Sequence, residues 1–185
     1  MSQADQDLEK AIASVALDHS LCPIPAPHCT VVYGVSHLSE SEIRNVFRDK
    51  IAPVAHGWPA LETQGSQVGV SYDGVDGEEM DMAWIEVTMK TSKKHEELVD
   101  KVHACLYNDA DCPEYRERQG PWQPHLSIAY DNPENSVLDD ICADKLFAKL
   151  PSLLGTRKRE VVAISLWRTQ GRYVRLVAVT LTPSG

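Results

Sequence analysis

Pro27-His28-Cys29-Thr30-Val31-Val32-Tyr33 and Pro124-His125-Leu126-Ser127-Ile128-Ala129-Tyr130 are two copies of one phrase, Pro-His-x-[Ser/Thr]-[Val/Ile]-x-Tyr. Both copies lie in apolar, β-branched surroundings, which favour β-strands. One copy falls in each half of the chain. The sequence therefore predicts a site that is built twice.

The spacing within each copy predicts where its side chains point. Residues two apart in a strand share a face, so His28 pairs with Thr30, and His125 pairs with Ser127. Two such strands facing each other would surround one pocket with two proton-transfer groups and two hydroxyl donors. That combination suits acid–base chemistry on a phosphate ester.

The shorter pattern His-x-[Ser/Thr] is weak evidence by itself, because it occurs a third time at His37-Leu38-Ser39. This copy lacks the preceding proline and the following tyrosine. Ser39 is followed three residues later by Glu42, which is typical of a capping box at a helix start. We therefore expect His37 to lie in a loop.

The composition is that of an ordinary globular protein, with 43% hydrophobic and 24% charged residues among 185. The formal net charge of −9 argues against a protein that coats extended nucleic acid. It leaves open one that takes a small nucleotide or an RNA 3′ end into a pocket. No run is long enough to span a bilayer and no export signal is evident. We expect a cytoplasmic or nuclear monomer without membrane contact.

The five cysteines indicate no metal site, because their spacing fits no zinc pattern. In a chain without an export signal we expect most of them to be reduced. Cys105 and Cys112 bracket the end of a predicted helix. Two unpaired thiols are the favoured interpretation, and a disulfide between them is the alternative under oxidising conditions.

Hydrophobic periodicity predicts helices and strands along the whole chain. Helices are predicted at residues 6–18, 39–52, 92–108 and 136–150, and a loop at 53–65. Strands are predicted at residues 28–35, 68–72, 83–89, 125–130, 162–166 and 174–180. This order predicts an α+β fold of two pseudo-symmetric lobes around a central cleft, each an antiparallel sheet with flanking helices. We expect one domain over residues 1–185, with an additional N-terminal helix in residues 1–20.

The two extended motifs resemble those of the two-histidine phosphoesterase superfamily, which is defined by His-x-[Ser/Thr] motifs on central strands of two lobes. The stretch Pro124 to Asp131 is similar to the second motif of plant and fungal cyclic phosphodiesterases. The resemblance implies a metal-independent enzyme without a cofactor. Members of the family hydrolyse 2′,3′-cyclic phosphates or ADP-ribose cyclic phosphate, process RNA ends or 2′-5′ linkages, or mainly bind nucleotide.

The residues of the two motifs match the demands of such a reaction. Opening a cyclic phosphodiester needs a base to activate water and an acid to protonate the departing ribose oxygen. Histidine can do either near neutral pH, so His28 and His125 are the catalytic candidates. Thr30 and Ser127 are the candidates for binding the phosphate oxygens. Which histidine is the base stays open.

Three further residues are candidate substrate contacts. Strict alternation turns Tyr130 to the core face, although a bulge at Ala129 would bring it to the pocket rim. Trp122 precedes the second motif in a loop, where stacking on a base and packing are equally acceptable interpretations. Arg175 flanks the last predicted turn, where a solvated hairpin end is the default and phosphate binding the alternative.

Three functions remain in competition. The first is a phosphodiesterase for 2′,3′-cyclic nucleotides or ADP-ribose 1′′,2′′-cyclic phosphate, favoured because the acidic balance suits a small substrate. The second is RNA-end processing or a 2′-5′ RNA ligase-like activity, which would need a basic track. The third is a non-catalytic nucleotide sensor, which the intact histidines and hydroxyls of both motifs argue against.

Overall fold

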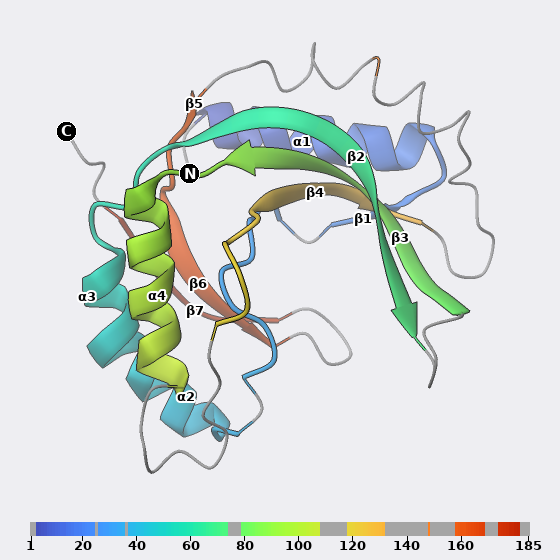
Figure 1. Cartoon of the computed structure of the whole chain (residues 1–185). Coiled ribbons are helices and arrows are strands. Elements are labelled where there is room, and N and C mark those ends of the chain that lie inside the picture. The colour runs from blue at the N-terminus through green and yellow to red at the C-terminus, as the bar shows by residue number, and fades with distance from the viewer. Residues whose placement is uncertain are drawn as a thin grey trace. The chain divides into compact units, whose positions relative to one another are not determined.

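A computed structural model describes residues 3–24, 26–35, 37–73, 79–107, 118–131, 148, 158–168 and 174–181 (Figure 1). Helices and antiparallel strands in two sheets confirm the α+β class. The chain divides into two compact units of three segments each. The first unit comprises Met1–Cys29, Glu62–Lys90 and Pro124–Arg157, and the second comprises Thr30–Leu61, Thr91–Gln123 and Lys158–Gly185. None of the described helices has the length and apolar character that crossing a membrane requires.

The described residues of the first unit form an antiparallel sheet and one long helix. Strands lie side by side in the order β1 (Cys22–Pro23), β4 (His125–Tyr130), β3 (Glu79–Lys90) and β2 (Leu61–Asp73). Helix α1 (Gln3–Asp18) packs against β1 and β4 (Figure 1). The buried apolar side chains of this unit include Ile12, Val15, Ala16, Ala83, Ile85, Val87, Met89, Leu126, Ile128 and Ala129.

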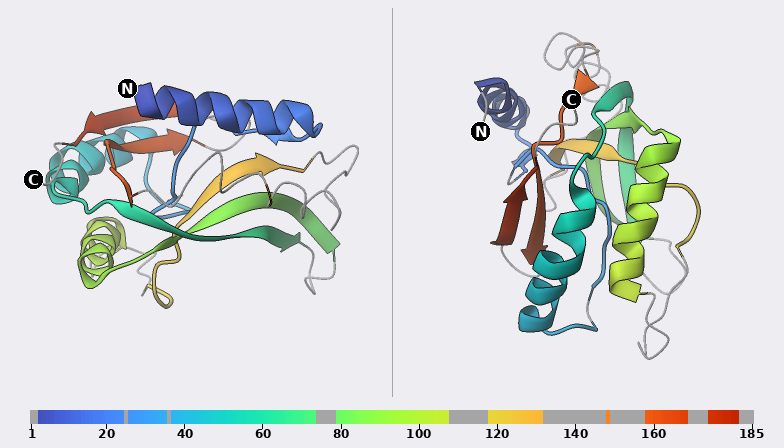
Figure 2. Two further views of the ribbon diagram at one scale, coloured as in Figure 1. Left: turned by 90° about the horizontal axis from the view of Figure 1, so that it is seen from above. Right: turned by 90° about the vertical axis from the view of Figure 1, so that its left-hand side faces the viewer.

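The second unit packs helices against a two-stranded sheet. Helix α2 (Glu40–Val46) continues through a π-helical turn, η1 (Phe47–Ile51), into α3 (Ala52–Ala55). These helices lie beside α4 (Lys93–Tyr107) and the antiparallel pair β6 (Ala163–Arg168) and β7 (Val174–Thr180) (Figure 2). The unit also holds a two-residue strand, β5 (Lys158–Arg159). Its core contains Ile43, Phe47, Ile51, Ala55, Trp58, Leu98, Val99, Val102, Leu106, Tyr107 and Leu181.

The start of α2 confirms the predicted capping box. The Ser39 side chain accepts from the Glu42 N–H, and the Glu42 carboxylate accepts from the Ser39 N–H at 2.8 Å. Hydrogen bonds from the Ser39 side chain and backbone lower the pKa of Glu42. The reciprocal bonds satisfy two N–H groups that a helix start would otherwise leave unpaired.

The predicted loop at residues 53–65 is wrong at both ends. Pro53 lies within the first turn of α3, a position where proline is tolerated because its missing N–H is not needed. The widened turn η1 lies immediately before it, so the helical path continues to Ala55. Strand β2 begins already at Leu61, and its pairing with β3 extends from Glu62.

The predicted strand at residues 28–35 is also wrong, because only Cys22–Pro23 forms a strand in this part of the chain. The segment is rich in β-branched residues, but two of its backbone carbonyls bond side chains of the second unit. Trp122 donates its Nε1–H to the Thr30 carbonyl at 2.9 Å, and the Tyr107 hydroxyl donates to the Tyr33 carbonyl at 3.3 Å. Those bonds use carbonyl groups that a ladder would otherwise need.

The remaining predicted elements agree with the described structure. Strand 125–130 is β4, helix 92–108 is α4, helix 6–18 lies within α1, and the two hairpins are β2–β3 and β6–β7. The predicted helix at 136–150 falls outside the described residues, apart from residue 148, which is helical. The single domain and the pseudo-symmetry of the lobes stay predictions.

Candidate functional site

The second motif is carried by β4, in the first unit. His125 lies opposite Thr88 and Ser127 lies opposite Glu86 on β3, while Leu126 between them is buried in the core. Directly opposed residues of antiparallel strands put their side chains on the same face. The predicted sharing of one face by His125 and Ser127 is therefore present, and Ser127 is only 5% exposed.

A register shift in β4 changes the direction of Tyr130. Ala129 pairs with Ile85, but the next pair along β3 joins Ser127 to Glu86, so Ile128 is an extra residue on β4. Ile128 and Ala129 are both fully buried, as expected where a bulge turns two consecutive side chains inward. Tyr130 then lies opposite Trp84, on the face of His125 and Ser127. The expectation from strict alternation, that Tyr130 faces the core, is wrong, and the register agrees with the alternative of a bulge beside Ala129.

A buried carboxylate lies beside His125. Glu86 is 5% exposed, and its Oε2 is 3.6 Å from Nε2 of His125. The same carboxylate accepts from Gln67 Nε2 at 2.7 Å and from Trp84 Nε1 at 2.6 Å. The indole of Trp84 and the imidazole of His125 lie with their ring centres 6.3 Å apart. Three neighbouring strands thus contribute to one polar face around His125.

Gly69 makes room for this arrangement on β2. It pairs with Trp84 across the β2–β3 ladder, and a Cβ at residue 69 would lie 2.2 Å from Cε2 of the indole. No side chain fits at that separation, so the indole lies directly over the glycine backbone. Four residues of this face were not predicted from the sequence, namely Trp84, Glu86, Gln67 and Gly69. A signal for two of them was available in the sequence. Because Ala83, Ile85, Val87 and Met89 alternate toward the core, Trp84 and Glu86 between them must lie on the opposite face.

The first motif has a different setting. Nδ1 of His28 lies 2.6 Å from the Ala26 carbonyl, so this nitrogen carries the hydrogen. The Thr30 hydroxyl donates to the Tyr33 hydroxyl at 3.2 Å, and Tyr33 is 67% exposed. Tyr33, the last residue of the first motif, therefore does not lie in the core. One of the boundaries between the two units along the chain falls between Cys29 and Thr30.

The pairing of β1 with β4 shows in which direction the chain runs as it leaves β1. Cys22 lies opposite Tyr130 and Pro23 opposite Ala129, in antiparallel register. From Pro23 onward the chain therefore leaves β1 in the direction of the His125 end of β4. His28 and His125 belong to the same compact unit.

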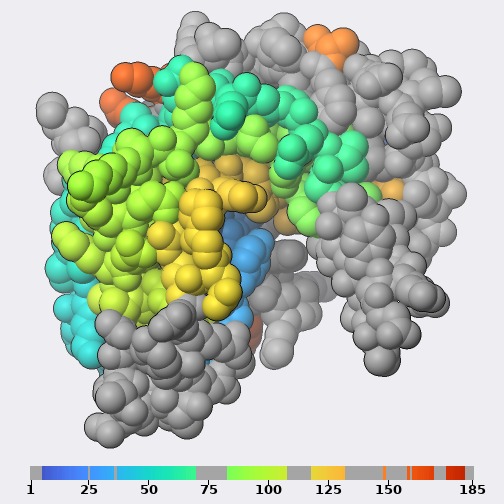
Figure 3. Space-filling model, viewed as in Figure 1, coloured from blue at the N-terminus to red at the C-terminus, as the bar shows by residue number. Residues whose placement is uncertain are grey.

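Trp122 is held by packing in the second unit. Its backbone N–H donates to the Glu96 carboxylate of α4 at 3.2 Å, and its ring meets Trp58 edge-on at 5.8 Å between centres. In Figure 3 the segment that contains it, in yellow, lies against α4, in light green. These contacts favour the packing interpretation of Trp122 over base stacking.

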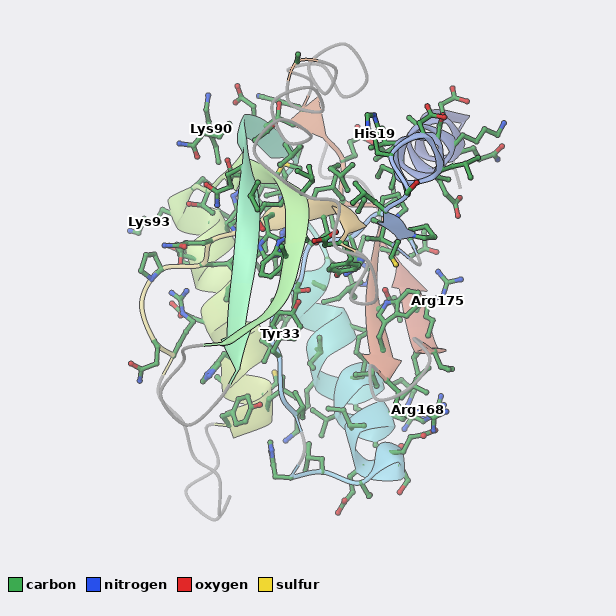
Figure 4. The ribbon with its side chains drawn as sticks, turned by 90° about the vertical axis from the view of Figure 1, so that its right-hand side faces the viewer. His19, Tyr33, Lys90, Lys93, Arg168 and Arg175 are labelled. Atoms are coloured by element: carbon green, nitrogen blue, oxygen red, sulfur yellow. The ribbon has the colours of Figure 1, made fainter. Side chains whose placement is uncertain are left out.

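Arg175 lies on the two-stranded sheet of the second unit, where its side chain is exposed (Figure 4). Its guanidinium is 5.7 Å from the ring centre of Trp167, which it faces across the β6–β7 ladder. Such a cation–π contact stabilises an exposed arginine by about 0.5–1 kcal/mol. Arg168 nearby lies 3.6 Å from Glu40. Both arginines therefore have structural partners within their own unit.

Two further sequence predictions concern thiols and metals. Cys105 is a free thiol, and burial raises its pKa, which lowers its reactivity. Cys112 lies outside the described residues. Within the described ranges, no cluster of histidine, cysteine, aspartate and glutamate has the arrangement of a metal site.

Comparison with known proteins identifies the family. No curated protein matches the chain. The sequence profile of the 2′-5′ RNA ligase superfamily matches residues 26–172, a range that contains both extended motifs. This superfamily is the two-histidine phosphoesterase group, whose members are phosphoesterases and ligases. The chain belongs to the 2′-5′ RNA ligase superfamily of two-histidine phosphoesterases.

Proposed function

We propose that the protein is a metal-independent phosphodiesterase that hydrolyses 2′,3′-cyclic nucleotides to nucleoside monophosphates. ADP-ribose 1′′,2′′-cyclic phosphate is a related substrate with the same reacting group. The observation that carries the proposal is the polar face of β4, where His125 and Ser127 lie together within the family match. No metal ion or cofactor takes part in the proposed reaction.

Each step of the proposed reaction has a candidate residue. One of His28 and His125 takes a proton from water, and the water oxygen attacks phosphorus. The bond from phosphorus to one ribose oxygen breaks, and the other histidine gives that oxygen its proton. The product is a 2′- or 3′-monophosphate, and the two histidines return to their starting states by proton exchange with solvent. Each positioned proton transfer contributes roughly 10²–10⁴-fold in rate.

Thr30 and Ser127 are proposed to donate hydrogen bonds to the non-bridging phosphate oxygens, where negative charge develops. Removing one such donor costs on the order of 3 kcal/mol in transition-state stabilisation. Ser127 is well suited because β4 and its neighbours hold it rigidly on a buried strand. Tyr130 is proposed as a substrate contact because it shares the face of His125 and Ser127.

The net charge favours a small substrate. At −9, the chain would repel an extended polyanion more than a single cyclic nucleotide. RNA-end processing or a ligase-like activity is the second candidate, because the matched superfamily carries the name of that reaction. We propose a cytoplasmic or nuclear monomer.

Turnover of the four 2′,3′-cyclic nucleotides in excess EDTA, followed by phosphorus NMR, tests the proposal. His28→Ala and His125→Ala are measured alongside, with His56→Ala as the matched control because His56 is exposed at the end of α3. We expect hydrolysis that survives EDTA, is unchanged in the control, and falls at least about a thousandfold in either motif variant.

Other outcomes contradict the proposal in distinguishable ways. Saturable nucleotide binding without turnover would indicate a sensor, and turnover only of an RNA 3′ end would indicate the second candidate. Unchanged activity in both motif variants would show that neither histidine is catalytic, which contradicts a two-histidine site.

A further inference from the structure

We propose that Glu86 is a positioning residue for His125, acting through the imidazole and not through the substrate. This inference rests on the proposed function, because it assigns a role within the same site. Glu86 belongs to neither motif. Its contacts, burial and charge single it out among the residues around β4.

The burial of Glu86 needs an explanation. A carboxylate removed from water is costly unless hydrogen bonds and an opposite charge compensate it. Gln67 and Trp84 supply one hydrogen bond to each carboxylate oxygen, but both are neutral. Among the described residues, His125 is the group of possible positive charge within 4 Å of Glu86. Gln67 and Trp84 satisfy the hydrogen bonding of the carboxylate but carry no charge, so His125 is the neighbour that can supply an opposite charge.

The geometry indicates an effect through charge. The Oε2–Nε2 separation of 3.6 Å is an ion-pair distance and is longer than a direct hydrogen bond. A carboxylate at that distance, on a buried face, restricts the orientation of the imidazole ring and complements it when the ring carries a second proton. His125 must hold a proton at one stage of the reaction whether it serves as acid or base. Glu86 can assist in both cases.

The surrounding residues fix Glu86 in turn. Gln67 on β2 binds Oε1 and Trp84 on β3 binds Oε2, so neither oxygen can swing away. Trp84 can reach the carboxylate because Gly69 leaves its indole room over β2. The chain of contacts runs from Gly69 through Trp84 and Glu86 to His125. A catalytic side chain whose orientation is fixed by neighbouring residues populates fewer unproductive orientations.

The first test is Glu86→Gln, which keeps the shape and removes the charge. We expect kcat for 2′,3′-cyclic nucleotide hydrolysis to fall about 10- to 100-fold, the range typical of residues that orient another group. KM should change less than about threefold, because Glu86 does not touch substrate. Glu86→Asp keeps the charge and should retain more activity than Glu86→Gln.

The matched control is Glu62→Gln. Glu62 also pairs across the β2–β3 ladder, but it is more exposed and forms its ion pair with Lys90 at 3.2 Å. An exposed pair of this kind contributes little to stability, so the control should keep the wild-type kcat. A fall in kcat of equal size in Glu62→Gln and Glu86→Gln would overturn the proposal.

A double variant separates positioning from a general structural role. In a His125→Ala background, Glu86→Gln should cost no further activity, since the group that it positions is gone. Equal losses in both backgrounds would show that Glu86 supports the fold alone. Thermal unfolding of each variant checks the same point, because a purely structural role would lower the midpoint in step with activity.

An NMR measurement keeps the inference testable if no substrate is turned over. The ring-nitrogen signals of His125, assigned by their loss in His125→Ala, should shift in Glu86→Gln and stay in place in Glu62→Gln. Unchanged His125 signals in Glu86→Gln would contradict the positioning role. Shifted signals together with an inactive wild type would instead contradict the proposed function and leave the role of Glu86 supported.

Discussion

The two copies of the motif follow one sequence pattern and differ greatly in structure. In the second copy, His125 and Ser127 lie on a paired strand, beside a buried carboxylate. In the first copy, His28 lies outside the strands, with its Nδ1 bound to the Ala26 carbonyl. The Thr30 hydroxyl is bound to an exposed tyrosine, whereas Ser127 is buried.

The repeated phrase therefore specifies which chemical groups are present and not the backbone structure that carries them. A histidine and a hydroxyl two residues apart share a face in any extended segment, with or without a neighbouring strand. In the first copy, the side chains of Trp122 and Tyr107 bind the backbone carbonyls that a ladder would bind. The second motif is thus positioned by a sheet, whereas the backbone of the first motif is positioned by individual side chains.

Replacing either motif histidine should have the largest effect on activity. His28→Ala and His125→Ala should each lower kcat at least about a thousandfold, because each removes one proton transfer. The measurement is the initial rate with a 2′,3′-cyclic nucleotide. Loss of activity in one variant alone would mean that only one copy of the motif is catalytic.

The hydroxyls should show the asymmetry of the two copies. Ser127→Ala should lower kcat about 100-fold, because a rigid donor to the developing charge is lost. Thr30→Val should have a smaller effect, because its hydroxyl also bonds Tyr33 and is less firmly positioned. The ratio of the two kcat values measures this difference. A larger loss in Thr30→Val would contradict the idea that β4 gives the better-positioned donor.

The tyrosines test the register shift in β4. Tyr130→Ala should raise KM about tenfold if the ring stacks on the base, since such stacking contributes 1–3 kcal/mol per base. Tyr33→Ala should leave KM within about twofold, because this ring is 67% exposed and lies in the other copy. Substrate titrations of both variants give the comparison. Equal KM values for Tyr130→Ala and Tyr33→Ala would show that Tyr130 does not contact the substrate.

The smallest effect is expected from metal removal. Dialysis against excess EDTA should leave kcat and KM unchanged, because two imidazoles supply the proton transfers that the reaction needs. Steady-state rates before and after dialysis, and after addition of Mg²⁺ or Zn²⁺, provide the measurement. Restoration of a lost rate by one of these ions would contradict the metal-independent mechanism.

Periodic patterns predicted most of the described fold. The alternation of Ala83, Ile85, Val87 and Met89 gave β3, and the capping box at Ser39 gave the start of α2. The strand expected at 28–35 is not formed, because β-branched residues show that a segment can form a strand, and not that a partner strand is present. The continuation through Pro53 was missed because a π-helical turn has no sequence signal comparable to a cap.

The candidate site was predictable only in part. The motif residues were found because their repetition is visible, and their catalytic roles stay predictions. The direction of Tyr130 depends on one extra residue in β4, which only the pairing with β3 reveals. Glu86 was missed because an acidic residue on the outer face of a strand normally contacts water. Its burial follows from neighbours on two other strands.

The catalytic coupling of His28 and His125 tests most directly whether the two motifs form one catalytic site. The double variant His28→Ala/His125→Ala is compared with both single variants in hydrolysis of a 2′,3′-cyclic nucleotide. If both copies serve one reaction, the double variant should be no more than about tenfold slower than either single variant, since groups that act as a unit are not additive. Losses that multiply would mean that the two copies act independently, and would contradict a single two-histidine site.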